Sequence, residues 1–118
     1  MGMYEELAEK REQVAYFMRR LYNKDLTTCS GGNISMRGPD DTVLITPAAL
    51  DKGELRPDQV AIIRLNGENL TPHIKPTIEA SLHTGVLRRR PEMNAVVHAH
   101  PVYATAFACM DIEIDISM

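Results

Sequence analysis

The segment 4–22 predicts an amphipathic helix because its apolar residues recur at helical spacing on a charged background. These apolar residues are Leu7, Val14, Met18 and Leu21. A polar stretch at residues 23–25 is expected to end the helix.

Four short apolar runs bounded by turn residues predict strands. They span residues 34–36, 43–46, 60–65 and 95–98. Asn66-Gly67 favours a tight hairpin turn after the third run. The fourth run begins Ala-Val-Val, which indicates a buried strand.

A second helix is predicted before the fourth strand. Pro76 suits a first helical turn, and Ile78, Leu82 and Val86 follow at helical spacing. Three arginines at 88–90 suit a helix C-terminus through its dipole, and a solvated helix end explains them better than a phosphate-binding patch.

The remaining chain continues this alternation, with a helix expected over 102–110 and a strand over 112–116. We find no internal repeat or linker in the sequence. Residues 1–118 therefore read as one domain, or as part of one.

Composition excludes some classes of function. The chain of 118 residues has 13 basic and 16 acidic side chains and a net charge of -3, which offers no electrostatic footprint for nucleic acid or an anionic membrane. It has no signal-peptide pattern and no apolar run of membrane-spanning length, so we expect a cytoplasmic protein. Cys29 and Cys109 are isolated and are expected to be reduced thiols.

The sequence His98-Ala99-His100 is a candidate metal-binding element at the end of the fourth strand. Residues i and i+2 of a strand point to the same face, and Glu79 could reach that point from the second helix. Two histidines and a carboxylate suit zinc or a similar divalent ion. Histidines in this spacing are also often structural or merely exposed, and both interpretations stay open.

The loop Ser30-Gly31-Gly32-Asn33 is a second candidate site. Glycines let the backbone come close to an anion, and successive amides can form a phosphate nest. A plain turn is the alternative, and the sequence lacks the glycine patterns of nucleotide-binding folds.

Four ordered motifs resemble those of the class II aldolase and adducin family. They are SGGNISMR at 30–37, LITP at 44–47, KPTIE at 75–79 and RPEMNAVVHAHP at 90–101. The resemblance covers nearly all of this chain but about the N-terminal half of the family's domain. It implies an α/β fold of three layers, with a mainly antiparallel sheet flanked by helices, and a homo-oligomer, as a tetramer.

The resemblance also implies roles for particular residues. His98 and His100 match two of three zinc-binding histidines, and Glu79 matches the catalytic acid/base, which can also bind the metal when substrate is absent. Positions matching phosphate contacts are Gly32, Asn33, Thr77 and the backbone of Ile78. His83 matches a structural position.

The implied reaction is aldol cleavage of a ketose, such as L-fuculose 1-phosphate, into a three-carbon ketone phosphate and an aldehyde. Zinc would stabilise the enediolate while Glu79 moves protons. Alternatives are a related epimerase or dehydratase, or an adducin-like interaction module without catalysis.

Three departures from the family pattern bear on these expectations. Ala48-Ala49 stands where the family commonly has Ser-Gly or Thr-Gly, and Ile78 stands where serine is frequent. The third histidine has no counterpart, so we expect a truncated or split form that binds zinc weakly alone.

Overall fold

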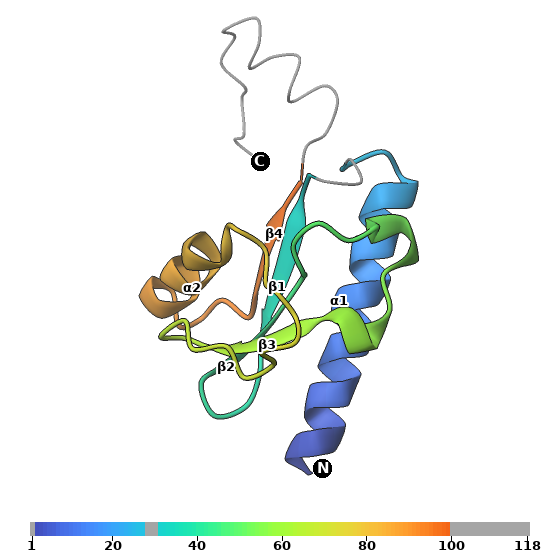
Figure 1. The fold of residues 1–118 in the computed structure, drawn as a ribbon. Helices are drawn as coiled ribbons and strands as arrows, with labels where there is room; N and C mark the ends of the chain where they lie inside the picture. Colours follow the sequence, from blue (N-terminus) through green and yellow to red (C-terminus); the bar gives the residue numbers. More distant parts are fainter. Residues whose placement is uncertain (1, 28–30, 100–118) are drawn as a thin grey trace, which may run out of the picture.

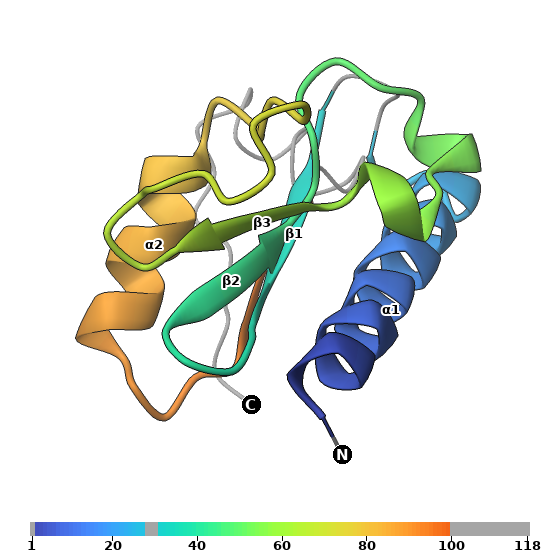
Figure 2. The same cartoon turned by 60° about the horizontal axis from the view of Figure 1, so that its bottom comes forward.

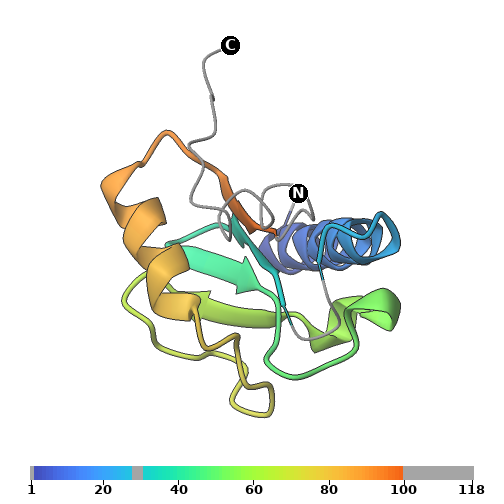
Figure 3. The same ribbon diagram turned by 90° about the horizontal axis from the view of Figure 1, so that it is seen from above.

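The described residues form one antiparallel sheet with one α-helix on each face. The computed structural model describes residues 2–27 and 31–99. The strand order is β3-β2-β1-β4, and the helices lie on opposite sides of the sheet (Figures 1, 2 and 3). The elements are α1 (Met3–Asn23), β1 (Asn33–Arg37), β2 (Thr42–Ile45), β3 (Ala61–Arg64), α2 (Ala80–Arg89) and β4 (Ala95–His98), with two 3-10 turns, η1 (Lys52–Glu54) and η2 (Pro57–Gln59). The expected α/β class with a mainly antiparallel sheet is confirmed.

Several sequence predictions lie outside the described residues. They are the helix over 102–110, the strand over 112–116, His100 and both cysteines. None of the helices that the structure does describe has the length and apolar character of a membrane span.

The apolar stripe of α1 forms the core on one face of the sheet. Val14, Ala15 and Met18 are fully buried, and they pack against Ile34 of β1 and Leu44 of β2. Burying such a side chain stabilises a fold by about 1.5–3 kcal/mol, so this face carries much of the folding energy.

Alternation along the strands supplies a second core on the face toward α2. Val43 and Ile45 of β2 point away from α1, since neighbouring strand residues face opposite sides. They cluster with Ile63 of β3 and Leu87 of α2. The sheet is therefore covered on both faces.

β1 departs from this pattern because its face toward α2 is polar. Asn33 and Ser35 lie on that face, followed by Arg37 at the end of the strand. The Nη2 of Arg37 donates to the carbonyl oxygens of Leu87 at 2.8 Å and Met93 at 2.9 Å. The last carbonyls of a helix have no partner within it, so Arg37 ties β1 to the C-terminal end of α2.

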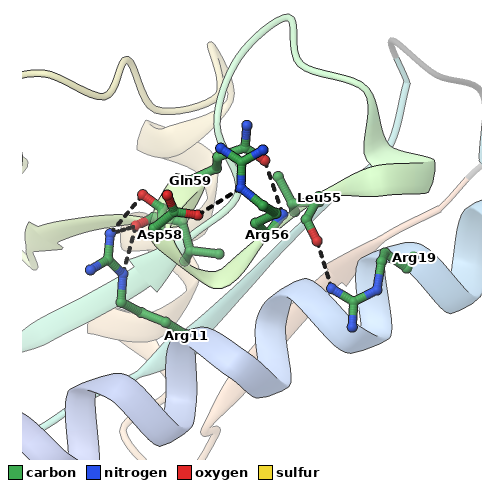
Figure 4. Close-up of polar contacts among 7 residues, drawn as sticks. Arg11, Arg19, Leu55, Arg56, Asp58 and Gln59 are labelled. Atoms are coloured by element: carbon green, nitrogen blue, oxygen red, sulfur yellow. Dashed lines mark hydrogen bonds and ion pairs between the residues drawn. The ribbon is translucent and has the colours of Figure 1, made fainter.

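Arginines of α1 hold the long connection between β2 and β3 (Figure 4). The Nη2 of Arg11 donates to the carbonyl oxygens of Val60 at 2.7 Å and Asp58 at 3.2 Å. The Nη1 of Arg19 donates to the carbonyl oxygen of Leu55 at 2.6 Å. These bonds satisfy carbonyls of the irregular segment that contains η1 and η2, and they fix it against the helix.

The helix α2 begins at Ala80, four residues after the predicted start at Pro76. The segment before it is extended because it pairs with the end of β2: the N–H of Thr77 donates to the carbonyl oxygen of Thr46 at 3.0 Å, and Pro47 forms a bridge with Pro76. A long-range contact therefore delays the helix.

The buried face of α2 also differs from the prediction. Ile78 precedes the helix with 85% of its surface exposed, and Leu82 is 52% exposed. The buried residues are His83, Thr84 and Leu87. His83 can be buried here because Ser35 and Asn33 of β1 are its hydrogen-bond partners.

The prediction that β4 is a buried strand is wrong. β4 pairs with β1 and is the edge strand of the described sheet. Val97 is 58% exposed, while Val96 packs against the core beneath α2. An apolar sequence can lie at a sheet edge, since pattern alone does not show what covers it.

Ala49 adopts a backbone conformation that favours glycine. Its φ is 56°, in the left-handed region where a Cβ costs about 1–2 kcal/mol. The residue is exposed, so its methyl group contributes little packing.

We therefore expect Ala49→Gly to raise the free energy of unfolding by about 0.5–1 kcal/mol, after allowance for the greater entropy of unfolded glycine. Urea denaturation measures the change. Ala48→Gly is the matched control, because Ala48 does not have a positive φ and its replacement is expected to destabilise by about 0.5–1 kcal/mol. A loss of stability in both variants would contradict this interpretation of Ala49.

Candidate functional site

Glu79 lies at the N-terminus of α2, where the chain turns from its pairing with β2 into the helix. The bonds from Thr77 to Thr46 and from Ala48 to the carbonyl oxygen of Lys75, at 2.9 Å, fix this approach. The carboxylate makes no capping bond to the helix, so it is available to the sheet.

His98 and Asn33 lie opposite each other on neighbouring strands. They are register partners of β4 and β1, which places side chains on one face close together. The Nδ1 of His98 donates to Oε2 of Glu79 at 2.5 Å, and the Nδ2 of Asn33 donates to the same oxygen at 2.8 Å. Three elements therefore converge on one carboxylate.

These contacts favour the charged form of Glu79. The hydrogen bond from Asn33, followed by that from His98, holds the pKa of Glu79 below its usual value, because both bonds favour the ionised form. The side chains of His98 and Glu79 are 31% and 37% exposed. The carboxylate is therefore ionised at neutral pH and accessible from solvent.

The structure places the other predicted site residues near this group. Gly32 precedes Asn33 and has a φ of 82°. Thr77 and Ile78 precede Glu79 directly; Thr77 is buried, whereas Ile78 is largely exposed. His100 lies outside the described residues.

The donor chemistry of the site suits a divalent metal in part. A carboxylate oxygen and an imidazole nitrogen lie within hydrogen-bond distance, and both are common zinc ligands. Within residues 2–27 and 31–99, no cluster of three such donors occurs. The described part of the chain thus supplies two of the expected ligands, Glu79 and His98.

Two buried residues beside the site, Ser35 and His83, were not predicted from the sequence to belong to it. Both are fully buried. The Nδ1 of His83 lies 2.6 Å from Oγ of Ser35, and its Nε2 bonds to Oδ1 of Asn33. Two signals in the sequence point to them: Ser35 follows Asn33 by two residues on one strand face, and His83 follows Glu79 by one helical turn.

The burial of His83 predicts a pH dependence of stability. Burial lowers the pKa of His83 from 6.5 to about 4, so between these values the unfolded chain binds a proton here that the folded chain does not. The free energy of unfolding should therefore fall as the pH drops from about 6.5 to about 4, by up to about 3 kcal/mol from this residue.

Urea denaturation across this range would measure the effect. His83→Gln should remove this part of the slope, whereas His73→Gln, at an exposed histidine, should keep it. A wild-type slope in His83→Gln would contradict the assignment.

Gly32 has little room for a side chain. A Cβ there would lie 2.3 Å from Cγ2 of Thr27 and 3.1 Å from the carbonyl oxygen of His98. We expect Gly32→Ala to lower the free energy of unfolding by about 2–4 kcal/mol, since backbone strain and overpacking add.

Gly67→Ala is the matched control for Gly32→Ala. Gly67 has a φ of 95°, and no atom lies within 4 Å of the position that a Cβ would take there. Its replacement should therefore cost only the strain, about 1 kcal/mol. If denaturation experiments show equal losses of unfolding free energy in Gly32→Ala and Gly67→Ala, close packing makes no contribution at Gly32.

The chain is similar in sequence to known proteins over most of its length. Residues 12–117 match the class II aldolase and adducin N-terminal domain. The chain is 35% identical to a 3-oxo-tetronate 4-phosphate decarboxylase of Haemophilus influenzae over 90% of its length and 50% of that protein. It is 38% identical to an L-fuculose phosphate aldolase of Methanococcus maripaludis, over 79% of this chain and 50% of the relative.

A solved structure extends the similarity to three dimensions. The crystal structure of L-fuculose-1-phosphate aldolase from Thermus thermophilus superposes with a TM-score of 0.70 at 28% identity, over 81% of this chain and 48% of that one. The chain thus spans about half the length of the curated relatives it matches. On the match to its N-terminal domain and on these identities, the chain belongs to the class II aldolase and adducin family.

Proposed function

We propose that this chain supplies the acid/base and part of the metal site of a lyase that cleaves a phosphorylated ketose by a retro-aldol reaction. The observation that carries the proposal is the 2.5 Å contact between Oε2 of Glu79 and Nδ1 of His98. The fold brings these two groups together from different elements and leaves both accessible.

Glu79, His98 and His100 are the residues that would hold a divalent metal such as zinc. When bound, the metal supplies Lewis-acid polarisation of the substrate oxygens. The imidazole and carboxylate of the described site fit this group chemically.

Glu79 is suited to move a proton. Its hydrogen bonds from Asn33 and His98 both engage Oε2, so Oε1 is the oxygen that would take the hydroxyl proton of the substrate as the carbon–carbon bond breaks. The electron pair of that bond stays on the ketone fragment, and the same carboxyl group would return the proton to that carbon. The ionised carboxylate favoured by these bonds is the form that acts as a base.

The substrate class rests on the relatives and on the residues around Glu79. Several relatives carry a phosphorylated compound in their names. We assign phosphate contacts to Gly32, Asn33, Thr77 and the backbone of Ile78. Thr77 and Ile78 precede Glu79 in the chain, Asn33 donates to its carboxylate, and Gly32 precedes Asn33. A tetrameric assembly also stays a prediction.

Other reactions of the same family compete with aldol cleavage. The relatives include decarboxylases and a dehydratase besides aldolases. Epimerisation is a further alternative, as is an adducin-like role in binding alone. A substrate screen should therefore include each of these reactions.

Glu79→Gln tests the proposal in the full-length protein. Glutamine keeps the size of the side chain but cannot accept the proton, so we expect turnover to fall by about 10²-fold or more, with most of the zinc retained. Turnover and zinc content are measured on the same preparation. Glu92→Gln is the matched control, since Glu92 pairs with Arg90 at the surface. Unchanged turnover in Glu79→Gln would exclude Glu79 from the reaction.

A further inference from the structure

His83 has no part in the reaction as proposed, yet it is among the most buried polar residues of the described chain. Its ring has no exposed surface, and neither has Ser35, while Asn33 is 5% exposed. A buried polar group is costly unless it is hydrogen bonded, so the bonding of this ring is closely constrained.

The partners of His83 determine which ring nitrogen carries the proton. Oδ1 of Asn33 can only accept, so Nε2 of His83 must donate to it. A neutral ring then has a lone pair on Nδ1, which accepts from the hydroxyl of Ser35 at 2.6 Å. Burial lowers the pKa of His83 and keeps the ring neutral at neutral pH, consistent with this tautomer.

The same bond determines the orientation of the Asn33 amide. With Oδ1 held by His83, Nδ2 faces Glu79 and donates to Oε2 at 2.8 Å. Rotation of the amide by half a turn would place its oxygen against a carboxylate oxygen, two acceptors without a proton between them.

We propose that His83 is a positioning residue, which, with its proton on Nε2 and Ser35 behind it, holds the Asn33 amide in the orientation that donates to Glu79. The hydrogen bonds run in one direction from Ser35 through His83 and Asn33 to the carboxylate. Glu79 makes no capping bond of its own, so Asn33 and His98 are its anchors among the described residues.

The importance of this arrangement for turnover rests on the proposed function. A displaced acid/base can lower the rate strongly even when the substrate still binds. His83 would therefore affect the chemical step through Asn33 without touching the substrate.

The first test reads the tautomer directly in the unmodified chain. Long-range proton–nitrogen correlation spectra at neutral pH should show His83 neutral with its proton on Nε2, and exposed His73 provides the internal comparison. A proton on Nδ1, or a charged ring, would overturn the proposal.

The second test follows the side-chain amide protons of Asn33. In His83→Phe, which has no donor for Oδ1 of Asn33, these protons should lose their distinct shifts or slow exchange. His83→Gln keeps an amide donor, so a smaller change is expected there. Thr84→Val is the matched control on the same helix, because the Thr84 hydroxyl bonds to the carbonyl oxygen of Ser81 and not to Asn33. Equal changes of the Asn33 amide protons in Thr84→Val would reduce His83 to a structural role. If His83→Phe does not fold, the amide protons of Asn33 in His83→Gln and in Ser35→Ala are measured in its place.

The third test separates the positioning role from the proposed function. In the full-length protein, His83→Phe, which has no donor for Asn33, should lower kcat about ten- to a hundredfold with KM within about twofold, and Thr84→Val should leave both nearly unchanged. A normal kcat despite a disordered Asn33 amide would overturn the positioning role. Absence of any lyase activity in the wild type would instead contradict the proposed function, while the spectra still decide the bonding of His83.

Discussion

The polar face of β1 that is buried beneath α2 is the constraint on which the site depends. Buried polar groups require partners. The buried Asn33 and Ser35 and the half-buried Arg37 on this face each find a partner in a different part of the chain. Asn33 bonds to Glu79, Ser35 to His83, and Arg37 to the carbonyl of Leu87. The bonds engage both ends of α2 and its middle, so satisfying the strand also fixes the position of the helix. Glu79, at the start of that helix, is located as a consequence.

The two faces of the sheet divide stability and chemistry between them. The core beneath α1 is apolar, centred on Val14, Met18 and Leu44, and it needs no specific geometry beyond close packing. The face beneath α2 combines a second apolar cluster with the hydrogen-bonded side chains of Ser35, His83 and Asn33. Directional bonds are required there because hydrophobic burial does not orient a side chain, whereas a hydrogen bond to a fixed acceptor does.

Sequence reasoning recovered what local pattern encodes and failed where a distant contact decides. The period of apolar residues predicted α1, and short apolar runs between turn residues predicted the four strands of the described sheet. The start of α2 could not be predicted, because it depends on the bond between Thr77 and Thr46. Glu79 and His98 were indicated by spacing and by family resemblance. The pairing of Ser35 with His83 was not, since it follows from how a helix sits on a strand nearly fifty residues away in the chain.

The buried, hydrogen-bonded side chains Ser35, His83 and Asn33 bear on the choice between a catalytic and a purely structural domain. Replacing both partners of a buried hydrogen bond with apolar groups of the same shape can be nearly neutral or stabilising, so a domain that only needed to fold could use an apolar face here. In this protein the hydrogen bonds from Ser35 through His83 and Asn33 all donate in the direction of Glu79. His98 donates to the same carboxylate oxygen, Oε2, as Asn33 does. Such an arrangement favours a negative charge at one accessible point. Folding alone does not require that charge, whereas the acid/base role that we propose for Glu79 does, which supports that proposal.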